Sequence, residues 1–467
     1  MTCHNGFSKT GTNMNLEAIV NNQREYFHTG VTKDIQFRKN SLERLLESII
    51  ENEPAIYTGL RQDLNKSEFE VYLTEVSNVI HSLKYAIKHL DSWSKPQKVR
   101  TPGSLFPAKS MCLRVPYGVT LIMSPWNYPF LLAIMPLVAA IAAGNCVIIK
   151  TSKSSPSTSG VIVDMINSTF ERNYVYAVEE VLPYDEILRQ NYDYIFFTGS
   201  ERVGKTVMRA AAETLTPITL ELGGKNPCIV DDTANIDLAA KKIMWAKIIG
   251  AGQTCVAPDY ILAHESIKTD LVNALASYSR QFTGDPFINN DYPRIVNLHH
   301  YMRLKNLISR ESNVIGGRSD DNQMRIEPAI FPDTTYDSAV MKDEIFGPIL
   351  PVITYDDTEY MLDKLIRRPN PLTVYIFSKN KAFTDKIIES VDFGSCCIND
   401  CIIHLANEEL PFGGVGTSGM GRYHGKSGFD TFTYEKSIMR TKNNSDIELR
   451  YPPFDEHKLS LLRRVVR

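Results

Sequence analysis

The sequence lacks any long hydrophobic run that is free of helix-breaking residues. Residues 115–149 carry no charge, and this stretch exceeds the roughly 20 residues that a transmembrane helix requires. Four prolines and the pair Gly144-Asn145 cut it into pieces of strand or buried-helix length, which is typical of a globular interior. The N-terminus has no apolar core of the kind that signal peptides carry, so we expect a polar, loosely ordered lead-in. The ending K-L-S-L-L-R-R-V-V-R is too short and too charged for an anchor, and together these features predict a soluble, cytoplasmic protein.

Cysteine is scarce, and charge is nearly balanced. The net charge of -3 gives no electrostatic reason to expect binding to nucleic acid or to an anionic membrane. The cysteines follow no disulfide framework, which suits a reducing compartment. A metal or redox site at C-C-x-x-x-C would need better spacing and partner ligands, so a packed strand end is the favoured interpretation of that cluster. The eight cysteines are Cys3, Cys112, Cys146, Cys228, Cys255, Cys396, Cys397 and Cys401.

The length of 467 residues exceeds the roughly 250–300 residues that one core supports, so we expect two or three domains. Helical periodicity runs through residues 37–50 and 70–90, followed by an exposed connector at 93–107. Apolar strands at 119–124, 146–150 and 194–198 then alternate with helices at 130–143, 157–170 and 202–214. This alternation predicts an α/β fold with a doubly wound parallel sheet, and a second alternation begins after residue 222. Residues 431–434 and 438–440 predict a hairpin at a sheet edge.

A candidate nucleophile lies in the stretch from Met244 to Tyr260, which reads M-W-A-K-I-I-G-A-G-Q-T-C-V-A-P-D-Y. Small and turn-forming residues surround Cys255 there, which lets a thiol stand free at a helix end or in a tight loop. The alternative is that Cys255 is a small core hydrophobe, as most free cysteines are.

Polar residues follow several predicted strands of the first sheet, at the edge where such sheets bind ligands. The Gly199-Ser200 turn, with Gly204 five residues after Gly199, suits a phosphate at a helix N-terminus, although a purely structural turn fits equally well. Lys150 is a donor for ribose or phosphate, or simply a solvated lysine. Partial burial would suit Glu221 to a general base, unless backbone amides hold its carboxylate. Asn127, between two prolines, is either a preorganised oxyanion donor or an Asx turn.

Six ordered motifs resemble the NAD(P)-dependent aldehyde dehydrogenase superfamily, from about residue 20 to the C-terminus. They are S-P-W-N-Y-P-F, F-F-T-G-S-x-x-V-G, L-E-L-G-G-K-N-P, G-Q-T-C-V-A-P-D-Y, D-E-I-F-G-P and P-F-G-G-V-G-T-S-G-M-G-R-Y-H-G-K. The fourth and sixth are most similar to the class 3 and fatty-aldehyde dehydrogenase branch. The resemblance implies a Rossmann-like cofactor domain (residues 15–95 and 117–222), a catalytic domain (223–415) and a bridging element for dimerisation (96–116 and 430–450).

The resemblance also implies roles for individual residues, matched motif by motif. Cys255 corresponds to the nucleophile, Glu221 to the general base and Asn127 to the oxyanion-hole amide. The cofactor would be held by the remaining matches, which are Lys150 at a ribose, Gly199, Ser200 and Gly204 at the pyrophosphate, and Glu344 and Phe346 at the nicotinamide ribose. The branch implies a homodimer that oxidises medium-chain or aromatic aldehydes, with Tyr72, Tyr128 and Phe412 as candidates for the substrate tunnel; no metal is implied.

One departure concerns the cofactor. Where the family usually carries a glutamate that binds the adenosine ribose, K-T-S-K places Lys153, whose ammonium attracts a 2′-phosphate that a carboxylate would repel. We therefore expect NADP to be accepted at least as well as NAD. Two other reactions remain open, namely acyl transfer to coenzyme A, against which Glu221 argues, and cofactor-free ester hydrolysis by the same thiol.

Overall fold

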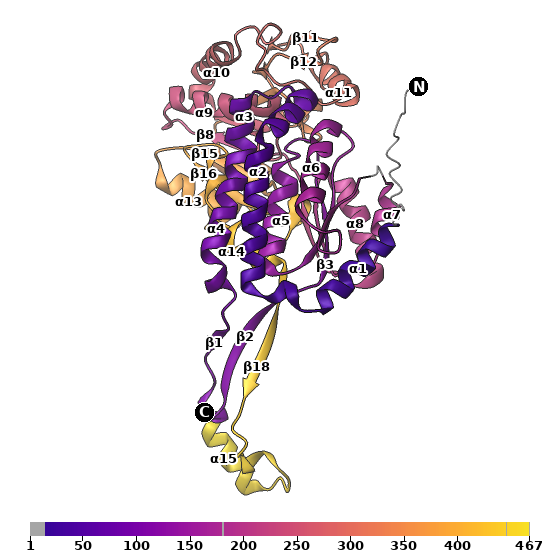
Figure 1. Cartoon of the computed structure of the whole chain (residues 1–467). Coiled ribbons are helices and arrows are strands. Elements are labelled where there is room, and N and C mark those ends of the chain that lie inside the picture. The colour runs from indigo at the N-terminus through magenta and orange to yellow at the C-terminus, as the bar shows by residue number, and fades with distance from the viewer. Residues whose placement is uncertain (1–14, 180–181, 445, 467) are drawn as a thin grey trace, which may run out of the picture.

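The computed structural model describes residues 15–179, 182–444 and 446–466. The polar lead-in expected at residues 1–14, with Cys3, lies outside the described residues. Two parallel-stranded sheets form the body, and a narrow arm projects from it (Figure 1). This arrangement confirms the predicted α/β class with parallel sheets.

The first sheet has six strands in the order β17-β7-β6-β3-β4-β5, parallel except for β17. Its core strands are apolar along their length and are bounded by turn residues, which is why their limits match the sequence pattern closely. The strands are β3 (Val119–Met123), β4 (Cys146–Lys150), β5 (Val175–Ala177), β6 (Tyr194–Thr198), β7 (Ile218–Glu221) and β17 (Gly419–Met420).

Helices cover this sheet on both sides. Helices α2, α4 and α5 pack against one another, whereas α1 contacts β3 and β4, and α8 contacts β6 and β7 (Figure 1). Helix α5 is buried on nearly every side, which accounts for its uniformly apolar sequence. The helices around this sheet are α1 (Leu16–His28), α2 (Ile35–Leu64), α3 (Glu68–Val71), α4 (Ser77–Trp93), α5 (Leu131–Ala143), α6 (Pro156–Thr169), α7 (Tyr184–Leu188), α8 (Glu201–Thr214) and α14 (Gly425–Thr431).

The second sheet has seven strands in the order β10-β13-β14-β9-β8-β15-β16. Along β15, Val374 and Ile376 enter one hydrophobic cluster, and Tyr375 and Phe377 enter another, so both faces of the strand are buried. Its strands are β8 (Pro227–Val230), β9 (Tyr260–His264), β10 (Ile315–Gly316), β13 (Ala329–Phe331), β14 (Ile349–Tyr355), β15 (Thr373–Phe377) and β16 (Ser395–Ile398). Its helices are α9 (Ile236–Ile248), α10 (Lys268–Thr283), α11 (Leu298–Ile308), α12 (Thr358–Ile366) and α13 (Lys381–Ser390), and β11 (Ser319–Asp320) pairs separately with β12 (Arg325–Ile326). The chain thus passes from one sheet to the other between β7 and β8, while the domain limits given above stay a prediction.

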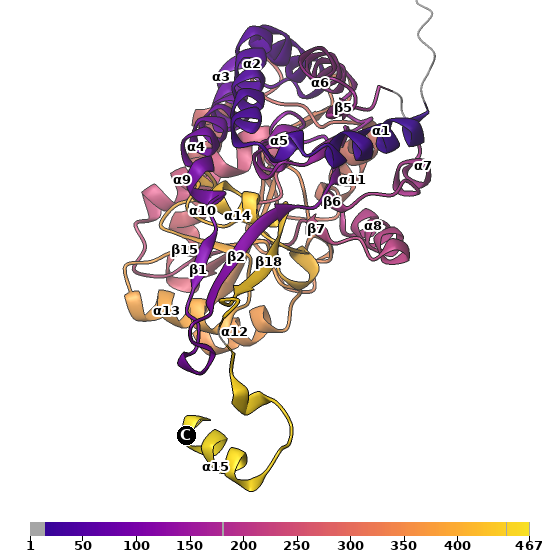
Figure 2. The same ribbon diagram turned by 60° about the horizontal axis from the view of Figure 1, so that its bottom comes forward.

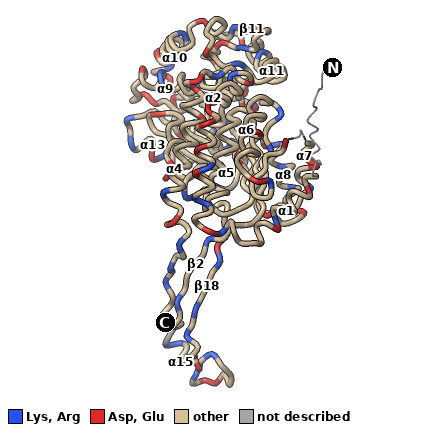
Figure 3. The backbone as a smooth tube through the Cα atoms, in the orientation of Figure 1, with Lys and Arg blue, Asp and Glu red and all other residues tan. Residues whose placement is uncertain are grey.

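The arm is a three-stranded antiparallel sheet of β1 (Gln97–Val99), β2 (Lys109–Pro116) and β18 (Thr433–Arg440), with α15 (Glu456–Val466) beyond it (Figures 1 and 2). Lysine and arginine recur along the arm (Figure 3). The hairpin expected at residues 431–440 is wrong, because β18 is one continuous strand paired with β2 from Thr433 to Arg440. The intervening residues Glu435-Lys436-Ser437 include no glycine, proline or asparagine to reverse the chain.

Candidate functional site

Four parallel strands of the six-stranded sheet end at the same edge, and each carries a predicted site residue there. Glu221 ends β7, Lys150 ends β4, Gly199-Ser200 follows β6, and Asn127 follows β3. The register pairs Met123 with Lys150 and with Phe197, so these strand ends are level with one another. Residues from four separate motifs therefore meet at the position where open parallel sheets bind ligands.

Cys255 lies just after the end of α9, where the chain makes a strained turn. Gly250, Ala251 and Gly252 have φ values of 57°, 51° and 72°, a left-handed conformation that disfavours residues with a Cβ. A Cβ at Gly252 would lie 2.3 Å from the carbonyl oxygen of Gly347, so glycine is required there. The turn leaves Cys255 partly buried in a loop, as the small residues around it predict.

Burial and two carboxylates set the acidity of the thiol. Burial, followed by the nearby Glu344 and Glu221, raises the pKa of Cys255 to about 12, although the amides of Cys255 and Val256 lower it in part. Both carboxylates therefore face Cys255 closely enough to act on its charge. A thiol in these surroundings needs a change in its electrostatic environment, or a base, before it attacks as a thiolate.

Asn127 is buried in the loop between β3 and α5, and its side chain reaches toward the nucleophile turn. Its Nδ2 donates a hydrogen bond to the carbonyl oxygen of Gln253 at 3.0 Å, two residues before Cys255. The Tyr128 hydroxyl next to it lies 2.8 Å from Thr254 Oγ1. The loop after β3 is thus fastened to the segment that presents the thiol, and the Asn127 side chain serves this link and not a local Asx turn.

Glu221 is 3% exposed, and neither of its carboxylate oxygens has a hydrogen-bond partner among the described residues. The alternative that backbone amides hold this carboxylate is therefore wrong. Burial raises its pKa well above the ordinary value, and Arg422 lowers it in part. A Cβ at Gly413 would lie 2.9 Å from Glu221 Oε1, so the glycine loop closes directly over the carboxyl group. A buried, unpartnered carboxyl group is a strong candidate for a proton acceptor.

Glu344 and Phe346 lie next to each other on the loop before β14. Glu344 Oε1 accepts a hydrogen bond from the Gly224 amide at 3.3 Å, and burial followed by Asp259 raises its pKa to about 8. Phe346 has a φ of 48° and meets the Trp126 ring edge-on, with 5.4 Å between the ring centroids. This loop thereby places a carboxylate and an aromatic wall beside Asn127 and Cys255.

Lys150 and Lys153 lie at the far side of the same edge. Lys150 Nζ donates to the Thr151 carbonyl at 2.9 Å and stands 4.8 Å from the centre of the Tyr184 ring. Burial and then the neighbouring Lys153 lower the pKa of Lys150. Lys153 itself is exposed on the turn before α6, so both cations are available to an anionic ligand.

Gly199, Ser200 and Gly204 form the start of α8. A Cβ on Gly199 would lie 2.5 Å from Phe197 Cζ, and one on Gly204 would lie 2.9 Å from Leu222 Cδ2, so both glycines allow the helix to pack on the strands. Ser200 occupies the N-cap position without a side-chain hydrogen bond to the helix. The first amides of α8 therefore remain available to a phosphate.

The sequence did not reveal the residues that support the turn before Cys255 and the Asn127 loop. Gln253 donates to Gly250 O and Arg294 O and accepts from Val296 N, which fixes the turn before the nucleophile. Lys66 and Glu75 form a buried ion pair beneath Asn127. No local signal marks these residues, because a glutamine in a loop, a lysine just after a helix and a glutamate in a helical segment are ordinary surface features.

The candidates for a substrate tunnel differ in burial. Tyr128 is buried with Leu132 and Ile249, and Leu131 and Trp245 pack against them, which forms an apolar cluster beside Asn127. Phe412 is buried and stacks on His424, whereas Tyr72 is 48% exposed. Of the three, Tyr128 contacts the nucleophile segment through its hydroxyl, which lies 2.8 Å from Thr254 Oγ1.

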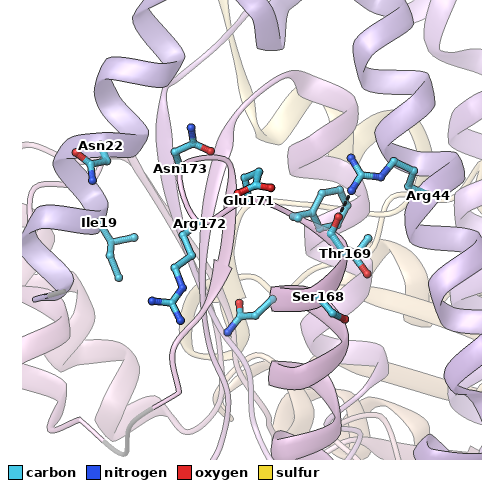
Figure 4. Close-up of a pocket in the computed structure, with 10 residues that line it drawn as sticks. Ile19, Asn22, Arg44, Ser168, Thr169, Glu171, Arg172 and Asn173 are labelled. Carbon is cyan, nitrogen blue, oxygen red and sulfur yellow. Dashed lines mark hydrogen bonds between the residues drawn. The ribbon is translucent and has the colours of Figure 1, made fainter. Parts of the chain in front are cut away.

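A cavity of about 410 Å³ lies away from these residues, between α1, α2 and the end of α6 (Figure 4). Arg44, Glu171 and Arg172 line it, and no predicted site residue does. Within the described ranges, no cluster of three or more histidine, cysteine or acidic side chains could hold a metal ion. Nor does any helix in the described part of the chain have the length and apolar character to cross a membrane.

Comparisons with known proteins identify the family of the chain. The model of the aldehyde dehydrogenase family matches residues 7–438. The chain is 47% identical over 443 residues to 4,4'-diaponeurosporen-aldehyde dehydrogenase of Staphylococcus aureus, covering 94% of this chain and 96% of that protein. It is 40% identical over 444 residues to aldehyde dehydrogenase family 3 member B1 of Rattus norvegicus, covering 94% and 95%.

Solved structures give the same result for the fold. The substrate-bound structure of Staphylococcus aureus AldH superposes with a TM-score of 0.94 at 45% identity, covering 98% of this chain and 100% of that one. An NAD+ complex of an aldehyde dehydrogenase from Bacillus cereus has a TM-score of 0.82 at 23% identity, covering 91% and 88%, and shows likeness of fold alone. The predicted fold and the predicted branch are both confirmed.

Proposed function

The chain belongs to the aldehyde dehydrogenase family, and from that premise we propose that it oxidises an aldehyde to its carboxylic acid, with Cys255 as nucleophile, Glu221 as base and Asn127 as oxyanion donor. The observation that supports these assignments is that Glu221 and Asn127 lie at one edge of the six-stranded sheet, where Asn127 binds the segment that carries Cys255. Glu221 is buried without a hydrogen-bond partner among the described residues and acts on the charge of Cys255, and Asn127 is bonded two residues before it.

The residues divide the reaction into two halves, the oxidation of the aldehyde to a thioester on Cys255 and the hydrolysis of that thioester. The sulfur of Cys255, once deprotonated, bonds to the aldehyde carbon, and the carbonyl oxygen becomes an oxyanion that the Asn127 amide stabilises. Loss of hydride from that carbon leaves a thioester on Cys255. Glu221 then takes a proton from water as the hydroxide attacks the thioester, which releases the carboxylic acid and returns the thiol. The high pKa of Glu221 makes it a stronger base than an exposed carboxylate when it is ionised.

A bound nicotinamide dinucleotide supplies the hydride acceptor for this oxidation. The donor set at the sheet edge fits such a ligand: the free amides at the start of α8 suit the pyrophosphate, Lys150 suits a ribose, and Glu344 with Phe346 suits the nicotinamide end. Gly204 belongs to the same helix start. Each of these assignments is a proposal about this chain.

The substrate class proposed is a medium-chain or aromatic aldehyde. The apolar cluster of Tyr128, Leu132 and Ile249 supports it, because an apolar aldehyde chain gains free energy by leaving water against such a wall. The Staphylococcus aureus relative, by its name, acts on the long apolar 4,4'-diaponeurosporen-aldehyde, so an extended chain belongs in the substrate panel.

The decisive assay follows aldehyde-dependent absorbance at 340 nm with purified enzyme, both cofactors and a panel of aldehydes. We expect Cys255→Ala to abolish the signal while leaving the unfolding temperature within a few degrees. A signal that requires coenzyme A would indicate an acylating enzyme. Ester cleavage without any aldehyde-dependent signal would indicate a hydrolase, and either result would overturn the proposal.

NADP is proposed as a cofactor at least as good as NAD. The exposed ammonium of Lys153 beside Lys150 supports this, since two cations attract a 2′-phosphate. We expect Lys153→Glu to lower kcat/KM for NADP and to leave that for NAD nearly unchanged. A wild-type preference for NAD above tenfold, unmoved by Lys153→Glu, would contradict the assignment.

We also propose a homodimer in the cytoplasm. The projecting arm of β1, β2 and β18 supports a bridging role, because an isolated three-stranded sheet gains stability by packing against a second surface. The free thiols of the described cysteines support a reducing compartment. Light scattering would give a mass near twice 52.8 kDa, and a monomer at micromolar concentration would contradict the dimer.

A further inference from the structure

Beneath the loop that carries Asn127 lies an ion pair that is sealed from solvent. Lys66 Nζ is 2.7 Å from Glu75 Oε1, and both side chains are 0% exposed. Lys66 follows the end of α2, and Glu75 belongs to a π-helical segment, Tyr72–Val76, between α3 and α4. Irregular turns of this kind within helices are common at functional sites.

Each member of the pair binds the backbone on one side of the Asn127 loop. Lys66 Nζ donates to the carbonyl oxygen of Asn127 itself at 2.9 Å and stands 3.7 Å from the centre of the Tyr128 ring. Glu75 Oε2 accepts hydrogen bonds from the amides of Phe130 and Leu131 at 3.0 and 3.1 Å. The pair therefore forms hydrogen bonds to the loop both at Asn127 and at the start of α5.

The opposite side of the loop is fixed to the nucleophile segment. Asn127 Nδ2 bonds to Gln253 O, and the Tyr128 hydroxyl meets Thr254 Oγ1. Glu70, on α3, accepts a hydrogen bond from the Gly250 amide at 2.7 Å, at the first residue of the strained turn. The region between α2 and α4 thus contacts both the oxyanion loop and the turn before Cys255.

Stability alone does not explain a buried ion pair in this position. Removing two charges from water costs several kcal/mol per ion, and apolar residues of similar volume often stabilise a protein equally well. What apolar residues would not provide is a directed bond to the Asn127 carbonyl. Because the peptide group and side chain of one residue move together, a bond that fixes the Asn127 backbone also restricts where its amide points.

We infer that Lys66 and Glu75 are positioning residues for the reaction, holding the Asn127 amide in line with the oxyanion that forms on the aldehyde bound to Cys255. This inference rests on the proposed function. Neither residue touches the reacting atoms, and both act only through the Asn127 loop. A displacement of about 1 Å at such a donor can lower a rate by about two orders of magnitude.

The test is a double-mutant cycle between the ion pair and Asn127. Lys66→Met/Glu75→Leu removes both charges of the pair together, so neither is left buried without the other and the variant is expected to fold. We expect its kcat to fall roughly 10- to 100-fold, with KM for the aldehyde changed by less than about threefold, because only the transition-state interaction is weakened. Asn127→Ala should lower kcat by about 10²- to 10³-fold, as loss of one oxyanion donor does.

The third variant separates positioning from general damage. If the pair acts through Asn127, adding Lys66→Met/Glu75→Leu to Asn127→Ala lowers kcat no further, whereas a structural defect would multiply with it. Arg24→Met is the matched control, since the Arg24–Asp193 ion pair fastens the opposite end of β3 through the Val119 amide. Arg24→Met should lower the unfolding temperature and leave kcat within about twofold of wild type.

The outcomes distinguish the two proposals. Wild-type kcat in Lys66→Met/Glu75→Leu, or losses that multiply in the combined variant, would overturn the positioning role alone. An Asn127→Ala enzyme as active as wild type would remove the oxyanion assignment, and the positioning role would fall with it. A wild-type enzyme without aldehyde-dependent cofactor reduction would overturn the proposed function itself.

Discussion

Glu75 and Glu221 are both buried carboxylates near the proposed site, and they differ in what surrounds them. Glu75 lies beneath the Asn127 loop, where Lys66, the Phe130 amide and the Leu131 amide all bind it. Glu221 lies at the end of β7, where neither oxygen has a hydrogen-bond partner among the described residues. Their exposures are nearly the same, 0% for the Glu75 side chain and 3% for Glu221, so burial does not distinguish them.

The difference lies in the partners. A carboxylate that binds an ammonium group and two backbone amides has its charge balanced by these partners. Such a group is suited to holding neighbouring segments of the chain in place. A carboxylate buried without partners keeps a raised pKa, and its free energy is lowered only by a proton or by a bound molecule. The first arrangement suits a group that holds a site in place, and the second suits the proton acceptor that we propose Glu221 to be.

Replacing Glu221 should cause the largest loss of activity. Glu221→Gln should lower steady-state kcat by about 10²- to 10⁴-fold, because water then attacks the thioester without a general base. Formation of the thioester does not need Glu221 to accept that proton from water. Stopped-flow absorbance at 340 nm should therefore show one rapid turnover per Cys255, followed by a slow phase.

The same variant should keep its fold, since no hydrogen bond to Glu221 is lost within the described structure. An unfolding temperature equal to or above that of wild type is the expected result. Steady-state turnover within threefold of wild type would remove Glu221 from the reaction and would leave its missing partners unexplained.

Replacing Glu75 should cause the next largest effect, a loss of stability. Glu75→Leu leaves the Lys66 ammonium buried without its counter-ion, which should cost about 3–5 kcal/mol of unfolding free energy. Restoring charge balance with Lys66→Met in the same chain should recover most of that loss. Urea denaturation followed by tryptophan fluorescence measures both variants, and a loss below about 1 kcal/mol for Glu75→Leu would show that the pair contributes little.

The residues proposed to take part in the reaction, such as Glu221 and Asn127, could be predicted from the sequence because they lie in short motifs that follow apolar strands. The limits of β4 and β6 follow from runs of β-branched and aromatic residues bounded by turns. Gly250 and Gly252 beside Cys255 likewise indicate a tight loop without reference to distant residues.

The Lys66–Glu75 ion pair could not be predicted, because it depends on contacts between distant parts of the chain. Lys66, just after α2, and Glu75, in a helical segment, would both be solvated in isolated pieces of chain, whereas in the fold they bind the Asn127 loop. The π-helical turn at Tyr72–Val76 also interrupts the 3.6-residue period. Tyr72, which that period places on the packing face, is consequently 48% exposed. Helix α9 was missed because its apolar residues lie on several sides of the helix and do not form a single stripe.

The smallest expected effect is on how the unfolding free energy depends on pH. Because the folded pKa of Glu221 lies above its unfolded value, the folded state keeps a proton that the unfolded chain releases. Its contribution to stability is therefore fully present below about pH 4.5 and is lost as pH rises, by at most about 1.4 kcal/mol per pH unit. Glu221→Gln cannot titrate, so the difference in unfolding free energy between wild type and variant should fall steadily from pH 5 to pH 7. Urea titrations at these pH values measure that difference, and a constant value would mean that the carboxyl group already finds a partner in solution and is not the free base that the proposed reaction requires.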